Sequence, residues 1–290
     1  MPRNRISNYI NKILSKLFDF EVLLLNNLTI FLFKSKQTFI KFMIILLSPA
    51  KSLDYDTNFN VQNHSQPEFI KEAEILVKEL KKFDSKSLEK LMDISQNLAQ
   101  LNFLRFKDFA QNPQRQALLA YDGDVYSKID KHKFTEKNFK YAQEHLRIIS
   151  GLYGILRPLD LIRPYRLEMA TDFSKVNFFK KNLYEFWGEK INEYLANTKS
   201  KELINLASQE YFAVLNPKKI PQKIYNIIFK EKKNGVLKIV AINAKKARGL
   251  MANYAVINNI DNPHDLKKFK EEDYQFNQQF SDQNNWVFSR

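Results

Sequence analysis

Apolar residues that recur every three or four positions predict a helical middle section of the chain. Helices are expected at residues 66–83, 87–106, 135–150 and 183–195. Ser65 and Glu68 have the spacing of a capping box at the start of the first helix. Thr135 can cap the third helix, whose apolar face would include Leu146 and Ile149. The stretch between residues 66 and 195 is therefore expected to be largely helical.

Continuous apolar runs predict strands at residues 43–47, 203–207, 224–229 and 236–242. Asn234-Gly235 between the last two runs is the strongest short-range hairpin signal, and a helix from Lys245 to about Asn258 is expected after them. Strands and helices do not alternate regularly. We therefore predict an α+β fold: a single domain, residues 43–290, with a mixed or antiparallel sheet and surrounding helices.

Residues 1–42 differ from the rest of the chain, with seven Lys and Arg against two Asp and Glu. Polar residues interrupt the apolar run Val22–Phe33, which falls short of the ~20 apolar residues of a spanning helix, so no stable membrane association is expected. We expect residues 1–42 to be an upstream extension, untranslated if synthesis starts at Met43, or disordered. The alternative is an amphipathic surface helix at Ile6–Phe20.

The composition points to an anionic partner. The net charge is +14, but Lys, Asn, Ile and Phe are all abundant, as expected of an A/T-rich genome, so arginine is the more informative residue. Four of the ten arginines fall within twenty residues: Arg147, Arg157, Arg163 and Arg166. The absence of cysteine excludes disulfides, thiolate metal sites and a cysteine nucleophile.

The segment His145–Met169 contains these arginines and a tight Leu-Tyr turn between Gly151 and Gly154. A glycine turn between two helices presents backbone N–H groups to phosphate, because glycine permits close approach. Arginine guanidinium groups around this turn would add hydrogen-bond donors for phosphate oxygens. However, the glycines are three apart rather than two, and Pro158 leaves little room for a second helix. The alternative is a loop whose arginines pair with Asp160 and Glu168.

Other candidate residues lie near the ends of predicted elements. Lys245, Lys246 and Arg248 would lie where a strand gives way to a helix, a place that favours anions. Lys51 and Asp54 follow the first strand, whose carboxyl end is where open sheets often place ligands. For the basic cluster at 245–248, a solvated turn is equally common.

Candidate acid and base groups are Asp122 and Asp124, which more often form a turn with Gly123, together with Glu168 and Glu210 near Ser208. No two of the four histidines have metal-ligand spacing, and the sequence has no Walker loop, dinucleotide fingerprint or Ser-His-Asp order. We therefore expect neither a bound metal nor a cofactor.

Six strings in this sequence resemble those of the YaaA family of peroxide stress proteins: SPAKSLDY at 48–55, DGDVY at 122–126, HLRIISGLYGILRPLDLIRPYRLEM at 145–169, LYEFWG at 183–188, INLASQEYF at 204–212 and KKARGLMANY at 245–254. They lie in family order, and the resemblance covers residues 43–290. The central string is too long and specific to be a generic motif.

The resemblance implies a cytoplasmic protein that limits unincorporated iron and oxidative DNA damage, with a helix-hairpin-helix-like element that binds DNA. Carried over to this chain, the hairpin falls at Ser150–Leu156. The implied basic cleft comprises Arg147, Arg157, Arg163, Arg166, Lys245, Lys246 and Arg248, with Gly151 and Gly154 at the turn. Polar positions that match the family strings, without assigned roles, are Lys51, Asp54, Asp124, Tyr165, Glu168, Ser208 and Glu210.

Two hypotheses follow. In the first, duplex or single-stranded DNA lies along the arginine-rich cleft, with phosphates on the glycine turn. In the second, the protein is an enzyme acting on a small phosphorylated or nucleobase-containing substrate in a polar pocket lined by Lys51, Glu168, Ser208 and Glu210. The sequence leaves the oligomeric state open.

Overall fold

The computed structural model describes residues 43–174, 176, 178 and 182–290. These residues belong to one compact unit, residues 41–290. The alternative surface helix at Ile6–Phe20 lies outside the described residues.

A sheet of eight strands forms the centre of the fold. Its strands are β1 (Met43–Leu47), β5 (Leu146–Ser150), β6 (Gly154–Leu156), β8 (Glu202–Asn205), β9 (Lys223–Lys233), β10 (Val236–Lys238), β11 (Gln275–Phe276) and β12 (Asn285–Ser289). The order is β11-β12-β9-β8-β1-β5-β6, and β10 pairs with β9. The five strands β12, β9, β8, β1 and β5 are parallel to one another. The strands β11, β6 and β10 pair antiparallel with β12, β5 and β9, respectively. The predicted mixed sheet in an α+β domain is confirmed.

Strand β1 lies between two parallel neighbours and is buried on both faces. All five of its residues have no exposed surface, and Ile45 pairs with Leu146 of β5 on one side and Ile204 of β8 on the other. A continuous apolar run is the sequence typical of such a strand, because neither face meets water. The expected strand at 43–47 is therefore confirmed.

A row of asparagine side chains crosses the other half of the sheet. The Asn205 amide on β8 donates to Asn226 on β9 (3.0 Å), and Asn226 donates to Asn285 on β12 (3.0 Å). At the ends of the row, the Ala207 N–H donates to Asn205 (3.0 Å) and Asn285 donates to Asp282 (2.9 Å). The row joins three parallel strands near the same level of the sheet.

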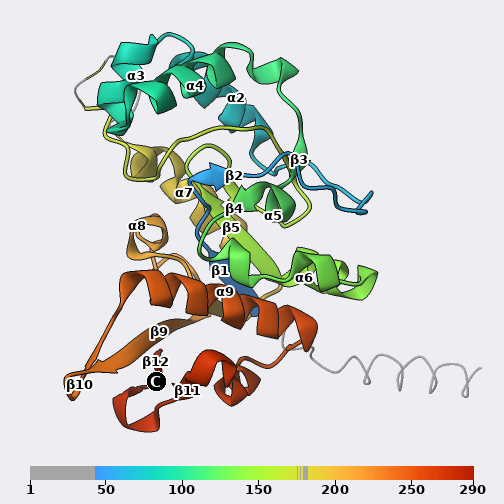
Figure 1. The fold of residues 1–290 in the computed structure, drawn as a ribbon, viewed down its shortest axis with the longest axis vertical. Helices are drawn as coiled ribbons and strands as arrows, with labels where there is room; N and C mark the ends of the chain where they lie inside the picture. Colours follow the sequence, from blue (N-terminus) through green and yellow to red (C-terminus); the bar gives the residue numbers. More distant parts are fainter. Residues whose placement is uncertain (1–42, 175, 177, 179–181) are drawn as a thin grey trace, which may run out of the picture. The chain divides into compact units, whose positions relative to one another are not determined.

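The helices surround this sheet (Figure 1). They are α2 (Ile70–Leu80), α3 (Ser85–Met92), α4 (Gln96–Lys107), α5 (Ala117–Ala120), α6 (Glu136–His145), α7 (Leu183–Ala196), α8 (Gln209–Phe212) and α9 (Ala241–Ile257). Figure 1 shows α2, α3 and α4 together at one end of this unit and β9 to β12 at the other. Two short ribbons, β2 (Ser52–Leu53) with β4 (Tyr121–Asp122) and β3 (Arg115–Gln116) with β7 (Leu161–Ile162), tie the loops together.

The first two expected helices, 66–83 and 87–106, differ from the prediction. Helix α2 begins at Ile70 rather than 66, because the Ser65 hydroxyl does not cap it and instead donates to buried Asp160 (2.6 Å). The helix expected over 87–106 is divided into α3 and α4, since Asp93 adopts the left-handed conformation (φ 48°, ψ 59°). Continuous helical periodicity concealed this break.

The third expected helix ends early. Thr135 caps α6 in a capping box with Asn138, as predicted, but α6 ends at His145, and residues 146–150 form β5. All residues of β5 are buried, and pairing with β1 and β6 on both edges outweighs the helical spacing of its apolar residues. The predicted helix-hairpin-helix at 150–156 is therefore wrong, because the turn joins two antiparallel strands.

The hairpin predicted at Asn234-Gly235 is confirmed. Both residues have positive φ (52° and 78°), as a two-residue hairpin turn between twisted strands requires. However, β10 ends at Lys238 and α9 begins at Ala241. The basic residues 245–248 therefore lie inside α9 rather than at a strand-to-helix turn.

Among the helices that the structure describes, none combines the length and the apolar character needed to cross a bilayer.

Candidate functional site

The carboxyl ends of the adjacent parallel strands β5, β1 and β8 bring together side chains that are far apart in sequence. Ser150 ends β5, Ser48 follows β1, and Ser208 lies three residues beyond β8. The edge formed by such strand ends is where open sheets commonly bind ligands. We call this region the strand-end site. It comprises Ser48, Lys51, Tyr121, Tyr126, Ser150, Tyr165, Arg166, Glu168, Ser208, Glu210 and Tyr211.

The two serines that follow β1 and β8 are in direct contact. The Ser208 N–H donates to Ser48 Oγ (2.8 Å), and the Ser48 hydroxyl donates to Ser208 Oγ (3.3 Å). Tyr126 fixes the same turn through a hydrogen bond to the Ser48 carbonyl (2.8 Å). Although Ser208 immediately precedes α8, its hydroxyl does not cap that helix. The Ser208 O–H can therefore serve a ligand.

Buried phenols form the floor of the strand-end site. The Tyr165 hydroxyl is 2.6 Å from Ser150 Oγ and 2.6 Å from the Tyr121 hydroxyl. Burial raises the pKa of Tyr165 to about 12, and it also raises the pKa values of Tyr121 and Tyr126. All three phenols are therefore protonated near neutral pH and act as hydrogen-bond donors.

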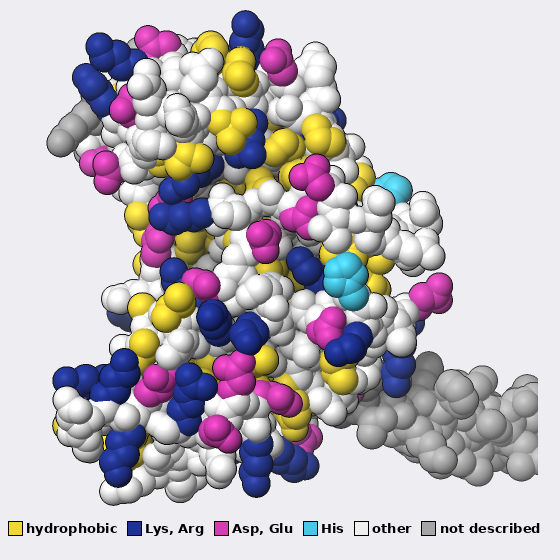
Figure 2. Space-filling view, viewed as in Figure 1, with side chains coloured by type: hydrophobic (Ala, Val, Ile, Leu, Met, Phe, Trp, Pro, Cys, Tyr) yellow, Lys and Arg dark blue, Asp and Glu magenta, His cyan; other side chains and the backbone are white. Residues whose placement is uncertain are grey.

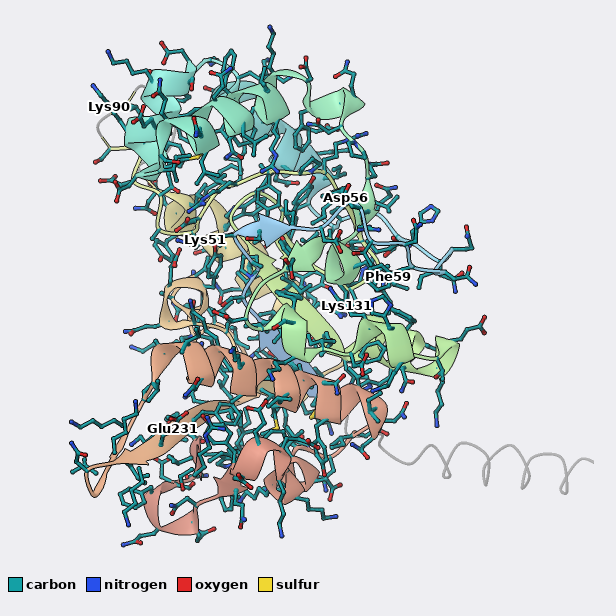
Figure 3. The ribbon with its side chains drawn as sticks, in the orientation of Figure 1. Lys51, Asp56, Phe59, Lys90, Lys131 and Glu231 are labelled. Carbon is teal, nitrogen blue, oxygen red and sulfur yellow. The ribbon has the colours of Figure 1, made fainter. Side chains whose placement is uncertain are left out.

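Charged side chains form the rim. Glu168 Oε1 accepts from Lys51 Nζ (3.0 Å) and from the Arg166 guanidinium (2.9 Å). The Lys51 side chain is 65% exposed, whereas that of Arg166 is only 16% exposed. Arg166 Nε is buried and has no hydrogen-bond partner within the described residues. Figure 3 labels Lys51.

Glu210 completes the rim from α8. Its carboxylate accepts from the Ala170 N–H (3.2 Å), and its carbonyl accepts from the Tyr184 hydroxyl (3.0 Å). Burial, and then the nearby Tyr165, Glu210 and Glu168, raise the pKa of Tyr211. Five of the seven polar positions expected from the sequence thus gather in one place: Lys51, Tyr165, Glu168, Ser208 and Glu210.

The remaining two, Asp54 and Asp124, have other surroundings. Asp54 accepts hydrogen bonds from the Asp56 and Thr57 N–H groups (2.9 Å each) and pairs with Arg115 (3.3 Å). Burial acts to raise its pKa, but these hydrogen bonds and Arg115 lower it to about 2. Asp124 lies in the turn between β4 and the short helix Tyr126–Lys128.

The four clustered arginines do not line a single surface. Arg147 is 7% exposed, and its guanidinium donates to the carbonyls of Gln143, Glu144 and Leu146 and to the Tyr194 hydroxyl. Arg157 pairs with buried Asp160 (3.0 Å) and Arg163 donates to the Asn112 carbonyl. The alternative of pairing with Asp160 and Glu168 is thus found for Arg157 and Arg166.

The two glycines of the 151–154 turn are packed against protein atoms rather than open to a phosphate. A Cβ on Gly151 would lie 2.2 Å from the Leu167 carbonyl oxygen, and one on Gly154, which has φ +70°, would lie 2.7 Å from the Trp187 ring. Trp187 also donates to the Gly151 carbonyl (2.8 Å). These glycines allow close packing of the loop 166–168 and of α7 against β5 and β6.

The basic residues of α9 point in different directions. Lys245 is exposed and Lys246 is half-buried. Arg248 is half-buried. Residues three, four and seven positions away on its side of the helix are buried: Ala244, Met251, Ala252 and Ala255. Burial lowers the Arg248 pKa.

Comparison with known proteins identifies the family. The sequence matches the family described as "Peroxide stress protein YaaA" over residues 43–280. It is 46% identical over 258 residues to UPF0246 proteins of Burkholderia mallei (strain SAVP1) and Burkholderia pseudomallei (strain K96243), and 44% identical over 256 residues to one of Janthinobacterium sp. (strain Marseille). Each match covers 86% of this chain and 98% of the relative.

The chain belongs to the YaaA family of peroxide stress proteins. Away from residues 150–156, two consecutive helices of the chain form a helical hairpin. Helices α3 and α4 of this YaaA-family chain pack against each other through a link of three residues, 93–95. The Ile94 N–H returns to the Glu89 carbonyl (3.2 Å), which closes the end of α3.

This helical hairpin of the YaaA-family chain escaped prediction because it lacks glycine. Asp93 occupies the left-handed position that glycine usually takes, and Asp is among the few other residues that do so. A signal was nevertheless present. Asp93 and Ser95 are turn and cap residues in the middle of an apolar periodicity, and together they mark a helix end followed by a new start.

Sequence reasoning also missed five members of the strand-end site: Ser48, Tyr121, Tyr126, Ser150 and Tyr211. Tyr121 and Tyr126 flank the Asp-Gly-Asp turn, and Tyr211 follows Glu210, so all lie within or beside the strings shared with the YaaA family. A serine that ends a buried strand was the available signal for Ser150. Over residues 43–290, apart from the few not described, no cluster of three or more His, Asp or Glu side chains could hold a metal ion.

Proposed function

We propose that this YaaA-family protein acts in the cytoplasm during peroxide stress by binding DNA through the α3–α4 hairpin, and that residues 43–290 carry this activity. Limitation of unincorporated iron and of oxidative DNA damage belongs to the same proposal. One observation carries it: the amino end of α4 is exposed at the tip of a helical hairpin whose first helix carries exposed lysines.

The amino end of α4 offers free backbone donors. The first turn reads Gln96-Asn97-Leu98, and these residues and Ser95 are exposed. The Ser95 side chain leaves the helix uncapped. Because the first N–H groups of a helix lack intrahelical partners, they and the positive end of the helix dipole favour a phosphate.

Lysines on α3 add positive charge to the same hairpin. Lys86 and Lys90 are exposed and lie one turn apart, so they share a face of α3. Figure 3 shows Lys90 at the end of the unit formed by these helices, and Figure 2 shows Lys and Arg interspersed with acidic side chains there. Lys245 on α9 contributes to the general positive potential of a chain with net charge +14.

The test is DNA binding by the full chain over a salt series, with fluorescently labelled duplex and single-stranded DNA. The Lys86→Gln/Lys90→Gln variant should bind about tenfold more weakly, and its salt dependence should lose about one unit of slope per phosphate contact removed. The control, Lys218→Gln/Lys232→Gln, makes the same charge change at exposed positions elsewhere. Equal effects of both variants would refute the assignment to the α3–α4 hairpin.

A further inference from the structure

Lys131 lies in the wall of a cavity. The cavity has a volume of about 470 Å³ and is bounded by residues 54–59, residues 122–132 and two residues of α9, Leu250 and Asn253. A second cavity, of about 410 Å³, also has Lys131 in its wall. Cavities of this size are typical of sites for small molecules. The lysine side chain is only half-buried, so a small molecule can reach its amine.

The Lys131 amine lies between a backbone carbonyl and an aromatic ring. Its Nζ donates to the Tyr121 carbonyl (3.3 Å) and is 5.7 Å from the centre of the Phe59 ring. Figure 3 labels both Lys131 and Phe59. The Arg115 guanidinium lies over the same ring, 5.5 Å from its centre. A second cation near the amine disfavours the charged form of the lysine.

Burial lowers the pKa of the Lys131 amine from its ordinary value of 10.5. The carboxylates of Asp122 and Asp54 act to raise this pKa and Arg115 acts to lower it, but burial has the largest effect. Near pH 7, a larger fraction of this amine is therefore neutral than in an exposed lysine. The neutral amine is the form that attacks a carbonyl carbon, because it has a lone pair.

The remaining titratable groups at the cavity are Lys128, Asp130 and His132. Lys128 pairs with Glu272 (2.6 Å), and Asp130 pairs with Lys133 (2.7 Å). The His132 ring stacks on the Phe59 ring, with 4.6 Å between the ring centres. Since each of the two ion pairs balances its own charge, burial remains the main influence on the lysine amine.

Two uncharged polar side chains of the cavity suit a hydroxyl group on a ligand. Asn253 Oδ1 accepts from the Asp130 N–H (3.0 Å), so the NH2 group of Asn253 is the part that can donate to a ligand. The Ser127 hydroxyl donates to the Asp124 carbonyl (3.2 Å), so its oxygen can still accept. A ligand hydroxyl both donates and accepts, and therefore matches this combination.

We infer that Lys131 is a carbonyl-reactive amine, and that its cavity takes a small hydroxyaldehyde and holds it as an imine. The Lys131 nitrogen adds to the carbonyl carbon, and the carbon–nitrogen double bond forms as the carbonyl oxygen leaves with the two amine hydrogens as water. The reaction needs no oxidant or reductant. This site is separate from the α3–α4 hairpin, and the inference does not depend on DNA binding.

The test treats the full chain with glyceraldehyde and cyanoborohydride, which reduces an imine to a stable amine, and follows each lysine by peptide mass mapping. At pH 7, Lys131 should be labelled at least about fivefold faster than exposed Lys140 on α6. The rate at Lys131 should saturate with glyceraldehyde concentration, whereas that at Lys140 should rise linearly. Equal rates at the two lysines, or a linear rate at Lys131, would overturn the inference.

Two variants separate the effect of charge from that of access. Asp122 acts to raise the Lys131 pKa, so Asp122→Ser should speed labelling of Lys131 about twofold at pH 7 and leave Lys140 unchanged. The advantage of Lys131 over Lys140 should shrink as the pH approaches 10.5, where exposed lysines also lose their protons.

The intact mass of the labelled protein gives an independent check. Lys131→Met should lose the adduct that forms saturably, and Lys140→Met should keep it. A saturable adduct that persists in Lys131→Met, or labelling of Lys131 that does not respond to Asp122→Ser, would refute the role of this amine.

Discussion

The strand-end site assembles side chains from segments as far apart as Ser48 and Tyr211, whereas the α3–α4 hairpin is one continuous stretch, Ser85–Lys107. The first is buried and depends on the exact packing of loops over the sheet edge. The second is exposed and presents backbone groups and flexible lysines. Substitutions in the scaffold of the strand-end site should therefore act mainly on stability, and those in the hairpin mainly on binding.

The largest effect is expected from Gly151→Ala, which attacks the packing under the strand-end site. The added Cβ would lie 2.2 Å from the Leu167 carbonyl oxygen, a backbone atom that cannot move aside without shifting the loop. We expect a loss of about 3 kcal/mol in the free energy of unfolding. Denaturant titration measures it. Gly235→Ala is the control, since its Cβ has open space among the described residues and only the positive φ costs about 1 kcal/mol. Equal losses would contradict the packing argument.

The next effect concerns Asp160, which holds the loop leading into the strand-end site. It is 1% exposed and accepts from Arg157, from the Arg157 N–H (2.7 Å) and from the Ser65 hydroxyl. Asp160→Asn keeps the shape but removes the charge, and should cost about 2 kcal/mol. Asp265→Asn, which breaks an exposed pair with Lys268, should change the unfolding free energy little. The reverse ranking in denaturant titrations would refute this role.

A smaller, pH-dependent effect is expected from Asp54. Its pKa in the folded protein is about 2, below the ordinary value of 3.8, so its carboxylate stabilises the fold above about pH 4. That contribution should disappear as the pH falls from about 4 to 2. After allowance for solvent screening, Asp54→Asn should cost about 1 kcal/mol at pH 6 and less at pH 3. An equal cost at both values would show that charge is not the cause.

The smallest effect is on DNA affinity at the hairpin. Ser95→Asp places a carboxylate at the amino end of α4, where it competes with a phosphate for the same N–H groups. Affinity should fall about threefold while the helix becomes slightly more stable. Asn58→Asp, the same charge change at an exposed loop residue, should leave affinity nearly unchanged. Unchanged affinity in Ser95→Asp would place the phosphate elsewhere.

The sequence predicted those elements whose signals are local. Met43–Leu47, the Thr135 cap and the Asn234-Gly235 turn each depend on a few neighbouring residues, and each is found. Strand β5 was assigned to a helix because its partners, β1 and β6, determine its conformation. The hairpin at Asp93 was missed because this aspartate adopts the left-handed conformation that glycine usually adopts at a helix end.

The candidate site was predictable only in part, for a related reason. Residue type and position after a strand were enough to suggest Lys51, Glu168 and Ser208. That Gly151 faces the Leu167 carbonyl, or that Arg147 donates to the Tyr194 hydroxyl, depends on contacts over long sequence distances. Clustering in sequence therefore overstated how closely the arginines act together. Arg147 and Arg163 bind backbone carbonyls, whereas Arg157 and Arg166 pair with Asp160 and Glu168.

The asparagine row across β8, β9 and β12 contains side-chain hydrogen bonds that all run in one direction. Asp282 can only accept, so Asn285 must turn its NH2 toward it, and Asn226 and Asn205 must follow in the same sense. The Asn205 oxygen is then left facing the Ala207 N–H, one residue before Ser208. The orientation of the segment that carries Ser208 is thereby set, through three amides in series, by a carboxylate on the far side of two strands.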